Sequence, residues 1–124
     1  MTGNSYQKLA MRTNDGESTS RLRDSLQGNY DKDTGGILMA CLGLSGEVGE
    51  FNDMIKKAVF HKTPLDEEHA KKELGDIMWY AAMVATSFGW QLDEIMEMNV
   101  DKLRKRYPEG FNVYAANHRK EDDV

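Results

Sequence analysis

Two short acidic motifs decide the fold and the chemistry expected of this chain: EVGE, from Glu47 to Glu50, and ELGD, from Glu73 to Asp76. In each motif two acidic residues stand three positions apart, and residues at that spacing share one face of a helix. Four carboxylates from two packed helices could therefore converge on one point. Such a cluster repels itself unless protons, ion pairs or bound cations offset the charge. Carboxylate oxygens are the ligands that Mg²⁺ and Mn²⁺ prefer.

Helical patterns surround both motifs. Residues 37–61, 65–88 and 92–107 carry apolar residues at helical spacing. Thr63-Pro64 predicts a capped start for the second of these helices, and Gly89 predicts its end. Short connections between long helices imply antiparallel neighbours, so the predicted fold class is all-α, an antiparallel helical bundle. The second helix is apolar around much of its circumference, which predicts that oligomerisation completes the bundle.

The chain is predicted to form a single domain over residues 1–124, because 124 residues suffice for one hydrophobic core. Its core is placed at residues 37–111. Outside that core, the sequence predicts a short helix at 6–12, a polar loop at 13–36 with a short helical turn around 21–27, and a loop from 109 that ends in a frayed tail at 119–124.

Composition excludes several classes of function. The net charge of −5 argues against general attraction to nucleic acid or to an anionic membrane. No apolar run approaches the roughly 20 residues of a membrane span, and the N-terminus lacks a signal-peptide pattern. A single cysteine, Cys41, excludes an internal disulfide and favours a cytoplasmic location. Because Cys41 falls on an apolar helix face, we expect it in the core.

The acidic residues border the predicted core faces. In the first long helix, the expected core stripe is Ile37, Cys41, Leu44, Val48, Phe51, Ile55 and Val59. The stripe beside it holds Ala40, Gly43, Glu47, Glu50, Met54 and Ala58. In the next helix, the core stripe is Ala70, Leu74, Ile77, Ala81, Val84 and Phe88, flanked by Glu73, Asp76 and Tyr80. The acids therefore have small or apolar neighbours, unlike carboxylates on a fully solvated face.

Three glycines in the first long helix need an explanation. Gly43, Gly46 and Gly49 each cost a helix about 1 kcal/mol relative to alanine. Close approach of another helix or of a ligand would offset that cost. The alternative is that Gly43 and Gly46 form the loose start of a helix that begins later.

The last helix adds polar residues that suit an anion. Asn99 falls within an apolar face, and Lys102 and Arg106 follow on the same side. An amide and two cations on one edge suit phosphate oxygens. The alternative is that Asn99 bonds to neighbouring backbone and that both cations are ordinary charges at a helix C-terminus. Tyr80, one turn past Asp76, could contact a phosphate or a base, although packing is the commoner role for such a ring.

Three longer stretches contain these features: GLSGEVGEF at 43–51, KELGDIMWY at 72–80 and NVDKLRKRYP at 99–108. Together they closely resemble MazG-like nucleotide pyrophosphohydrolases of the all-α NTP pyrophosphatase superfamily. The resemblance runs from about Ile37 to Phe111, and residues 6–13 also resemble the start of small single-domain members, including phage-encoded ones. One departure is that many members have two adjacent glutamates where this chain has Gly46 before Glu47.

The resemblance implies a metal-dependent nucleoside triphosphate pyrophosphohydrolase that converts (d)NTP to (d)NMP and pyrophosphate by water attack at the α-phosphorus, in nucleotide-pool control or house-cleaning. It implies that the catalytic and metal-binding residues are Glu47, Glu50, Glu73 and Asp76, which would hold Mg²⁺ with Mn²⁺ as a substitute. The implied substrate contacts are Tyr80, Asn99, Lys102 and Arg106, with Lys57 as a further phosphate candidate for which a solvated face is the alternative. The implied assembly is a homodimer or homotetramer.

Two other classes of protein compete with this interpretation. A di-iron carboxylate bundle needs a histidine three residues after a glutamate on two helices, and His61, His69 and His118 do not meet that condition. A non-catalytic helical module that binds a nucleotide or a protein stays open. The base is also open between dCTP, dUTP, dGTP and damaged nucleotides.

Overall fold

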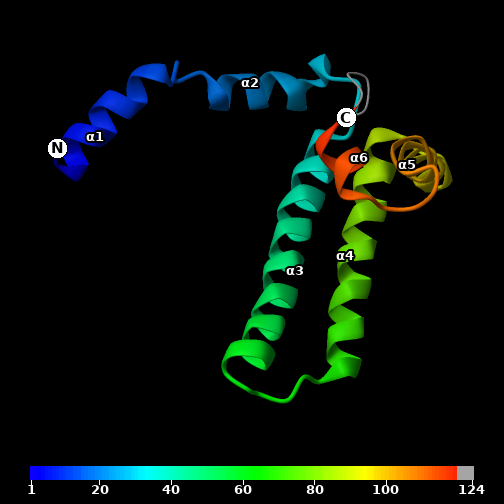
Figure 1. Ribbon diagram of the computed structural model, residues 1–124. Coiled ribbons are helices and arrows are strands. Elements are labelled where there is room, and N and C mark those ends of the chain that lie inside the picture. Colours follow the sequence, from blue (N-terminus) through cyan, green and yellow to red (C-terminus); the bar gives the residue numbers. More distant parts are fainter. Residues whose placement is uncertain (120–124) are drawn as a thin grey trace.

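The computed structural model describes residues 1–119, and most of these residues are helical (Figure 1). Its helices are α1 (Gly3–Ala10), α2 (Ser18–Asp24), α3 (Thr34–Phe60), α4 (Glu67–Phe88), α5 (Leu92–Arg106) and α6 (Val113–Asn117). A 3₁₀ turn (Met11–Thr13) follows α1, and a π-type turn (Ser25–Asn29) follows α2. No strand occurs within residues 1–119, so the all-α prediction is confirmed.

The centre of the fold is an antiparallel hairpin of α3 and α4, which lie side by side along most of their length (Figure 1). The buried side chains of this hairpin are small: Ala40 on α3, and Ala70 and Ala85 on α4. At Gly43 an added Cβ would lie within 2.6 Å of three atoms of the Tyr80 ring. The predicted close approach of another helix is therefore confirmed at Gly43, and the loose-start alternative is wrong because α3 already begins at Thr34.

The other two glycines of α3 behave differently. No described atom lies within 4 Å of a Cβ built at Gly46 or at Gly49. These two positions therefore face open space, and nothing among the described residues requires glycine there.

The ends of α4 show one wrong prediction and one correct one. The N-cap is Asp66, whose side chain accepts a hydrogen bond from the backbone N–H of His69 at 3.1 Å. Thr63 is not the cap, because α4 begins only at Glu67. The N–H of Thr63 bonds Lys57 O and closes the turn after α3. The C-terminal end is as predicted, since Gly89 adopts the left-handed conformation with φ 74°.

Two segments expected to be mainly loop contain short helices, of which α2 overlaps the helical turn predicted around 21–27. Within 13–36, α2 forms a helix beside an Arg21–Asp15 ion pair, and α3 starts early because Asp33 caps it by accepting from Gly36 N at 3.1 Å. Beyond residue 109, α6 forms after Asn112, whose side chain accepts from Ala115 N. Both α2 and α6 are too short to show a clear periodic pattern. Residues 120–124 of the predicted frayed tail lie outside the described residues.

The predicted core stripe of α3 is only partly right, since Ile37, Leu44 and Phe51 are half-buried. Cys41 is exposed, and so are Val48, Ile55 and Val59, whereas Ala40 is fully buried. The acid-bearing stripe of small residues faces α4 instead, because small side chains allow the two helices to approach closely. The bulky stripe is only partly covered within the described chain, and no large side chain of residues 1–119 is fully buried.

Candidate active site

Three of the four predicted acids meet in the seam of the hairpin. Glu47 comes from the middle of α3, and Glu73 and Asp76 come from successive turns of α4. Each offers one carboxylate oxygen, and these oxygens all lie within 4.8 Å of one another. We call these three residues the acidic cluster. Since its donors are all carboxylate oxygens, its chemistry suits a hard divalent cation such as Mg²⁺ or Mn²⁺.

Partial burial of Glu47 and Glu73 distinguishes the acidic cluster from a solvated acidic patch, although Asp76 is exposed. The Glu73 side chain is only 14% exposed, and Glu47 is half-buried. With both carboxyls ionised, the Oε2 atoms of both residues are buried and accept no hydrogen bond from any described residue. A buried carboxylate oxygen without a partner is costly. A divalent cation between these oxygens would supply the missing interaction, so the residues present fit the metal that the sequence predicts.

The electrostatics of the acidic cluster agree with this geometry. A hydrogen bond shared with Glu73 raises the pKa of Glu47 to about 7, and burial and the charge of Glu50 act in the same direction. The same shared bond lowers the pKa of Glu73, as does the hydrogen bond from His69. The two facing carboxyls therefore share one proton up to near-neutral pH. A cation that binds both must displace that proton.

Glu50 lies at the margin of the acidic cluster. It stands one turn after Glu47 on α3, its side chain is exposed, and its oxygens are not part of the group within 4.8 Å. Its charge nevertheless contributes to the raised pKa of Glu47. Glu50 is therefore near enough to act on the cluster, while it remains open to solvent or to a ligand.

Tyr80 borders the same seam. It follows Asp76 by one turn of α4 and is half-buried, with its ring against the backbone of Gly43. Trp79 makes an edge-on contact with that ring at a centroid distance of 5.0 Å. Packing therefore accounts for the position of the ring, which also places it beside the acids.

The predicted phosphate contacts on α5 are not brought to the acidic cluster in this protomer. Asp76 lies twelve residues before the C-terminal end of α4, a distance of about 18 Å along the helix. Beyond that end α5, seen nearly end-on in Figure 1, makes no extended packing with α3 or α4. Asn99 is exposed rather than buried as expected, since no neighbouring helix covers its face. Lys102 is partly exposed, and the Arg106 guanidinium lies 5.9 Å from the centroid of the Tyr107 ring.

Lys57 already has an acidic partner. Its Nζ lies 2.7 Å from Asp53 Oδ2, on an exposed face where Lys56 also reaches Asp53 at 3.1 Å. The solvated-face alternative describes this arrangement better than a phosphate contact does.

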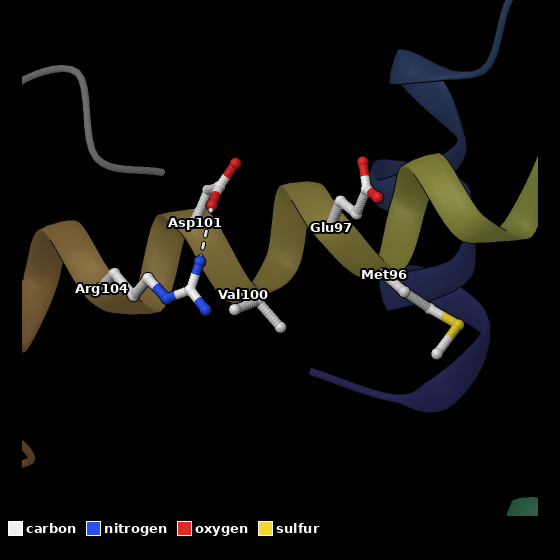
Figure 2. Close-up of a pocket in the computed structure, with 5 residues that line it drawn as sticks. All are labelled: Met96, Glu97, Val100, Asp101 and Arg104. Atoms are coloured by element: carbon white, nitrogen blue, oxygen red, sulfur yellow. Dashed lines mark hydrogen bonds and ion pairs between the residues drawn. The ribbon is translucent and has the colours of Figure 1, made fainter.

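A surface hollow on α5 does not coincide with any predicted site. Figure 2 shows its lining residues, Met96, Glu97, Val100, Asp101 and Arg104. All of them come from one exposed helix, and Arg104 is paired with Asp101 at 3.4 Å. The hollow offers no convergent set of polar groups, so we assign no function to it.

Sequence reasoning missed one residue beside the acidic cluster. His69 Nε2 lies 3.0 Å from Glu73 Oε1. The spacing of four residues between His69 and Glu73 is itself a signal for contact on a helix.

The all-α hairpin with carboxylates in its seam has the donor atoms that a metal-binding helical protein needs. Comparison with known families identifies the class of protein more narrowly. Residues 37–111 match the MazG nucleotide pyrophosphohydrolase domain. The chain belongs to this family, and the resemblance of its three motifs is confirmed.

One relative supports the same conclusion. The chain is 33% identical over 88 residues to the Gene 37 protein of Mycobacterium phage L5, an alignment that covers 68% of this chain and 77% of that protein. No solved structure matches the chain. Among residues 1–119, none of the helices combines the length and the apolar character needed to cross a membrane.

Proposed function

We propose that this protein is a metal-dependent nucleoside triphosphate pyrophosphohydrolase, which converts (d)NTP to (d)NMP and pyrophosphate by attack of water at the α-phosphorus. The observation that carries the proposal is the acidic cluster: three carboxylates from two helices within 4.8 Å, two of them with buried, unpartnered oxygens. Membership of the nucleotide pyrophosphohydrolase family supports the same reaction class.

In this proposal Glu47, Glu73 and Asp76 hold Mg²⁺, with Mn²⁺ as a substitute, and Glu50 adds a carboxylate at the solvent side. The bound cation supplies neutralisation of the triphosphate charge and activation of the attacking water. The chain's own contribution is to hold the carboxylates in a partly desolvated seam, where Glu47 and Glu73 give up their shared proton as the cation binds. The neutralised centre lets a protein of net charge −5 accept a polyanionic substrate.

Substrate contacts come from two places. Tyr80 stands next to the acidic cluster and is proposed to line the sugar or phosphate position. Asn99, Lys102 and Arg106 offer an amide and two cations along α5, which suits phosphate oxygens. Because α5 does not pack along the hairpin, these residues would complete a site only when the chain associates with further copies of itself.

We also propose that the working form is a homodimer or homotetramer. The chain exposes 10378 Å², whereas a compact monomer of 14.1 kDa exposes about 6,700 Å². Bulky apolar side chains remain more than half exposed, including Leu42, Met78 and Trp79. Obligate interfaces bury roughly 2,000–5,000 Å² counted over both partners, so the excess of about 3,700 Å² on this one chain is more than one partner contributes to a typical interface of that kind. Such an assembly would also cover the apolar stripe of α3 that α4 leaves open.

The test is an assay of the purified protein with each dNTP and NTP in Mg²⁺ or Mn²⁺, with pyrophosphate and monophosphate as the products measured. The proposal expects Glu73→Gln and Asp76→Asn to lose at least about 100-fold in rate, since each removes a charged ligand. Asp53→Asn is the matched control, because Asp53 is an acid of α3 that pairs with lysines outside the acidic cluster. A non-catalytic module would bind nucleotide without releasing pyrophosphate, and undiminished turnover in both cluster variants would refute the proposed site.

A further inference from the structure

His69 makes a hydrogen bond to an acid of the cluster. Its Nε2 lies 3.0 Å from Glu73 Oε1, one turn further along α4. An ion pair between two exposed side chains at this spacing contributes little. Here the acceptor carboxylate is only 14% exposed although the imidazole is 57% exposed. A hydrogen bond to a desolvated carboxylate restricts that carboxylate more than the same bond on an open surface would.

The backbone of His69 is itself fixed. Asp66, the N-cap of α4, accepts a hydrogen bond from His69 N at 3.1 Å. A continuous chain of contacts therefore runs from the start of the helix through the imidazole to Glu73. This series of contacts links the orientation of the Glu73 carboxylate to the first turn of α4.

The two carboxylate oxygens of Glu73 have different surroundings. Oε1 accepts from the imidazole, whereas Oε2 is buried and has no partner among the described residues. The ring nitrogens of His69 are not part of the group of ligand atoms within 4.8 Å. His69 is therefore placed to act through Glu73 rather than to bind a cation directly. Groups that orient a metal ligand in this way typically alter metal affinity 10–100-fold when removed.

We propose that His69 is a positioning residue of the metal centre: its Nε2–H donates to Glu73 Oε1 and so keeps the other carboxylate oxygen directed to a divalent cation. The role rests on the proposed function only in taking the acidic cluster as the cation site. It does not depend on the charge of the imidazole, since the neutral ring with a proton on Nε2 and the doubly protonated ring both donate from that nitrogen.

The test measures Mn²⁺ binding to the substrate-free protein by electron paramagnetic resonance or calorimetry. We expect His69→Ala to weaken Mn²⁺ binding about 10-fold, and we expect His69→Gln, which retains an N–H donor, to recover most of that loss. Lys72→Ala is the matched control, because it removes another contact between residues four apart on α4, the exposed Lys72–Glu68 pair at 3.4 Å, and should leave Mn²⁺ binding unchanged. Circular dichroism and thermal melting establish that each variant is folded. His69→Asn, whose amide is too short to reach Glu73, replaces His69→Ala if the alanine variant is unstable.

The outcomes separate this role from the proposed function. Equal Mn²⁺ affinity in the wild type and in a folded His69→Ala or His69→Asn variant would overturn the positioning role, as would a His69→Gln variant no better than His69→Ala. Wild-type protein that binds Mn²⁺ but releases no pyrophosphate from any nucleotide would overturn the proposed function and leave the positioning role standing. Absence of Mn²⁺ binding by the wild type would overturn both.

Discussion

Replacing Gly43 with alanine tests how closely α3 and α4 approach. A Cβ at this position would lie within 2.6 Å of Cε1, Cζ and Cδ1 of the Tyr80 ring, so the ring or the helix must move. Overpacking of this kind costs about 1–3 kcal/mol. Alanine also stabilises a helix by about 1 kcal/mol relative to glycine. We therefore expect Gly43→Ala to change the free energy of unfolding by between about zero and a loss of 2 kcal/mol.

Gly46→Ala is the matched control on the same helix. No described atom lies within 4 Å of its added Cβ, so only the propensity gain of about 1 kcal/mol remains. The free energies of unfolding of the two variants should therefore differ by about 1–3 kcal/mol, with Gly43→Ala the less stable. Denaturant unfolding followed by circular dichroism measures this difference. A thermal shift assay gives an independent reading.

A double-mutant cycle identifies the source of that difference. In a Tyr80→Ala background the clash is absent, so Gly43→Ala should stabilise by about as much as Gly46→Ala does. The reasoning fails if Gly43→Ala and Gly46→Ala are equally stable in the wild-type background. It also fails if the cost of Gly43→Ala persists once the ring is removed.

The remaining predictions concern charge. Because the pKa of Glu47 is raised from its ordinary value of 4.5 to about 7, the folded, metal-free protein binds more protons than the unfolded chain between those pH values. The contribution of Glu47 to stability is therefore present below pH 4.5 and lost as pH rises through about 7, and Glu47→Gln should flatten this part of a series of thermal melts. For the same reason the apparent Mn²⁺ affinity should rise from pH 6 to pH 8 with release of a proton, seen by calorimetry in two buffers of different ionisation enthalpy, and a pH-independent affinity would contradict the shared proton. Lys57→Ala should leave KM within about twofold of the wild-type value, since Lys57 is occupied by Asp53 on an exposed face; a tenfold rise would restore it as a phosphate contact. Lys102→Ala should raise KM for nucleotide by about 10-fold, the scale of one charge-assisted hydrogen bond. Its Mn²⁺ affinity without substrate should not change, because α5 is not packed on the acidic cluster, and unchanged KM would remove Lys102 from the substrate site.

The secondary structure was predictable wherever the chain carries a long periodic pattern. The three long helices lie close to their predicted bounds, and Gly89 ends α4 as expected. Of the short helices, α2 overlaps the helical turn predicted around 21–27, whereas α6 was missed because a helix of five residues shows too few turns to reveal a period. The cap of α4 was misplaced because Thr63 and Asp66 are both good capping residues, and only the path of the preceding turn decides between them.

The functional site, like the secondary structure, was predictable from the sequence only in part. The spacing of the acids places Glu47 and Glu50 on one face of α3 and Glu73 and Asp76 on one face of α4, and the three motifs were sufficient to identify the family. Helical periodicity states which residues share a face, but it does not state which face another helix will cover. The tertiary structure decided that the small, acid-bearing stripe of α3 meets α4, because small side chains permit the closest approach of two helices. That choice left Cys41 exposed and brought three acids rather than four within 4.8 Å.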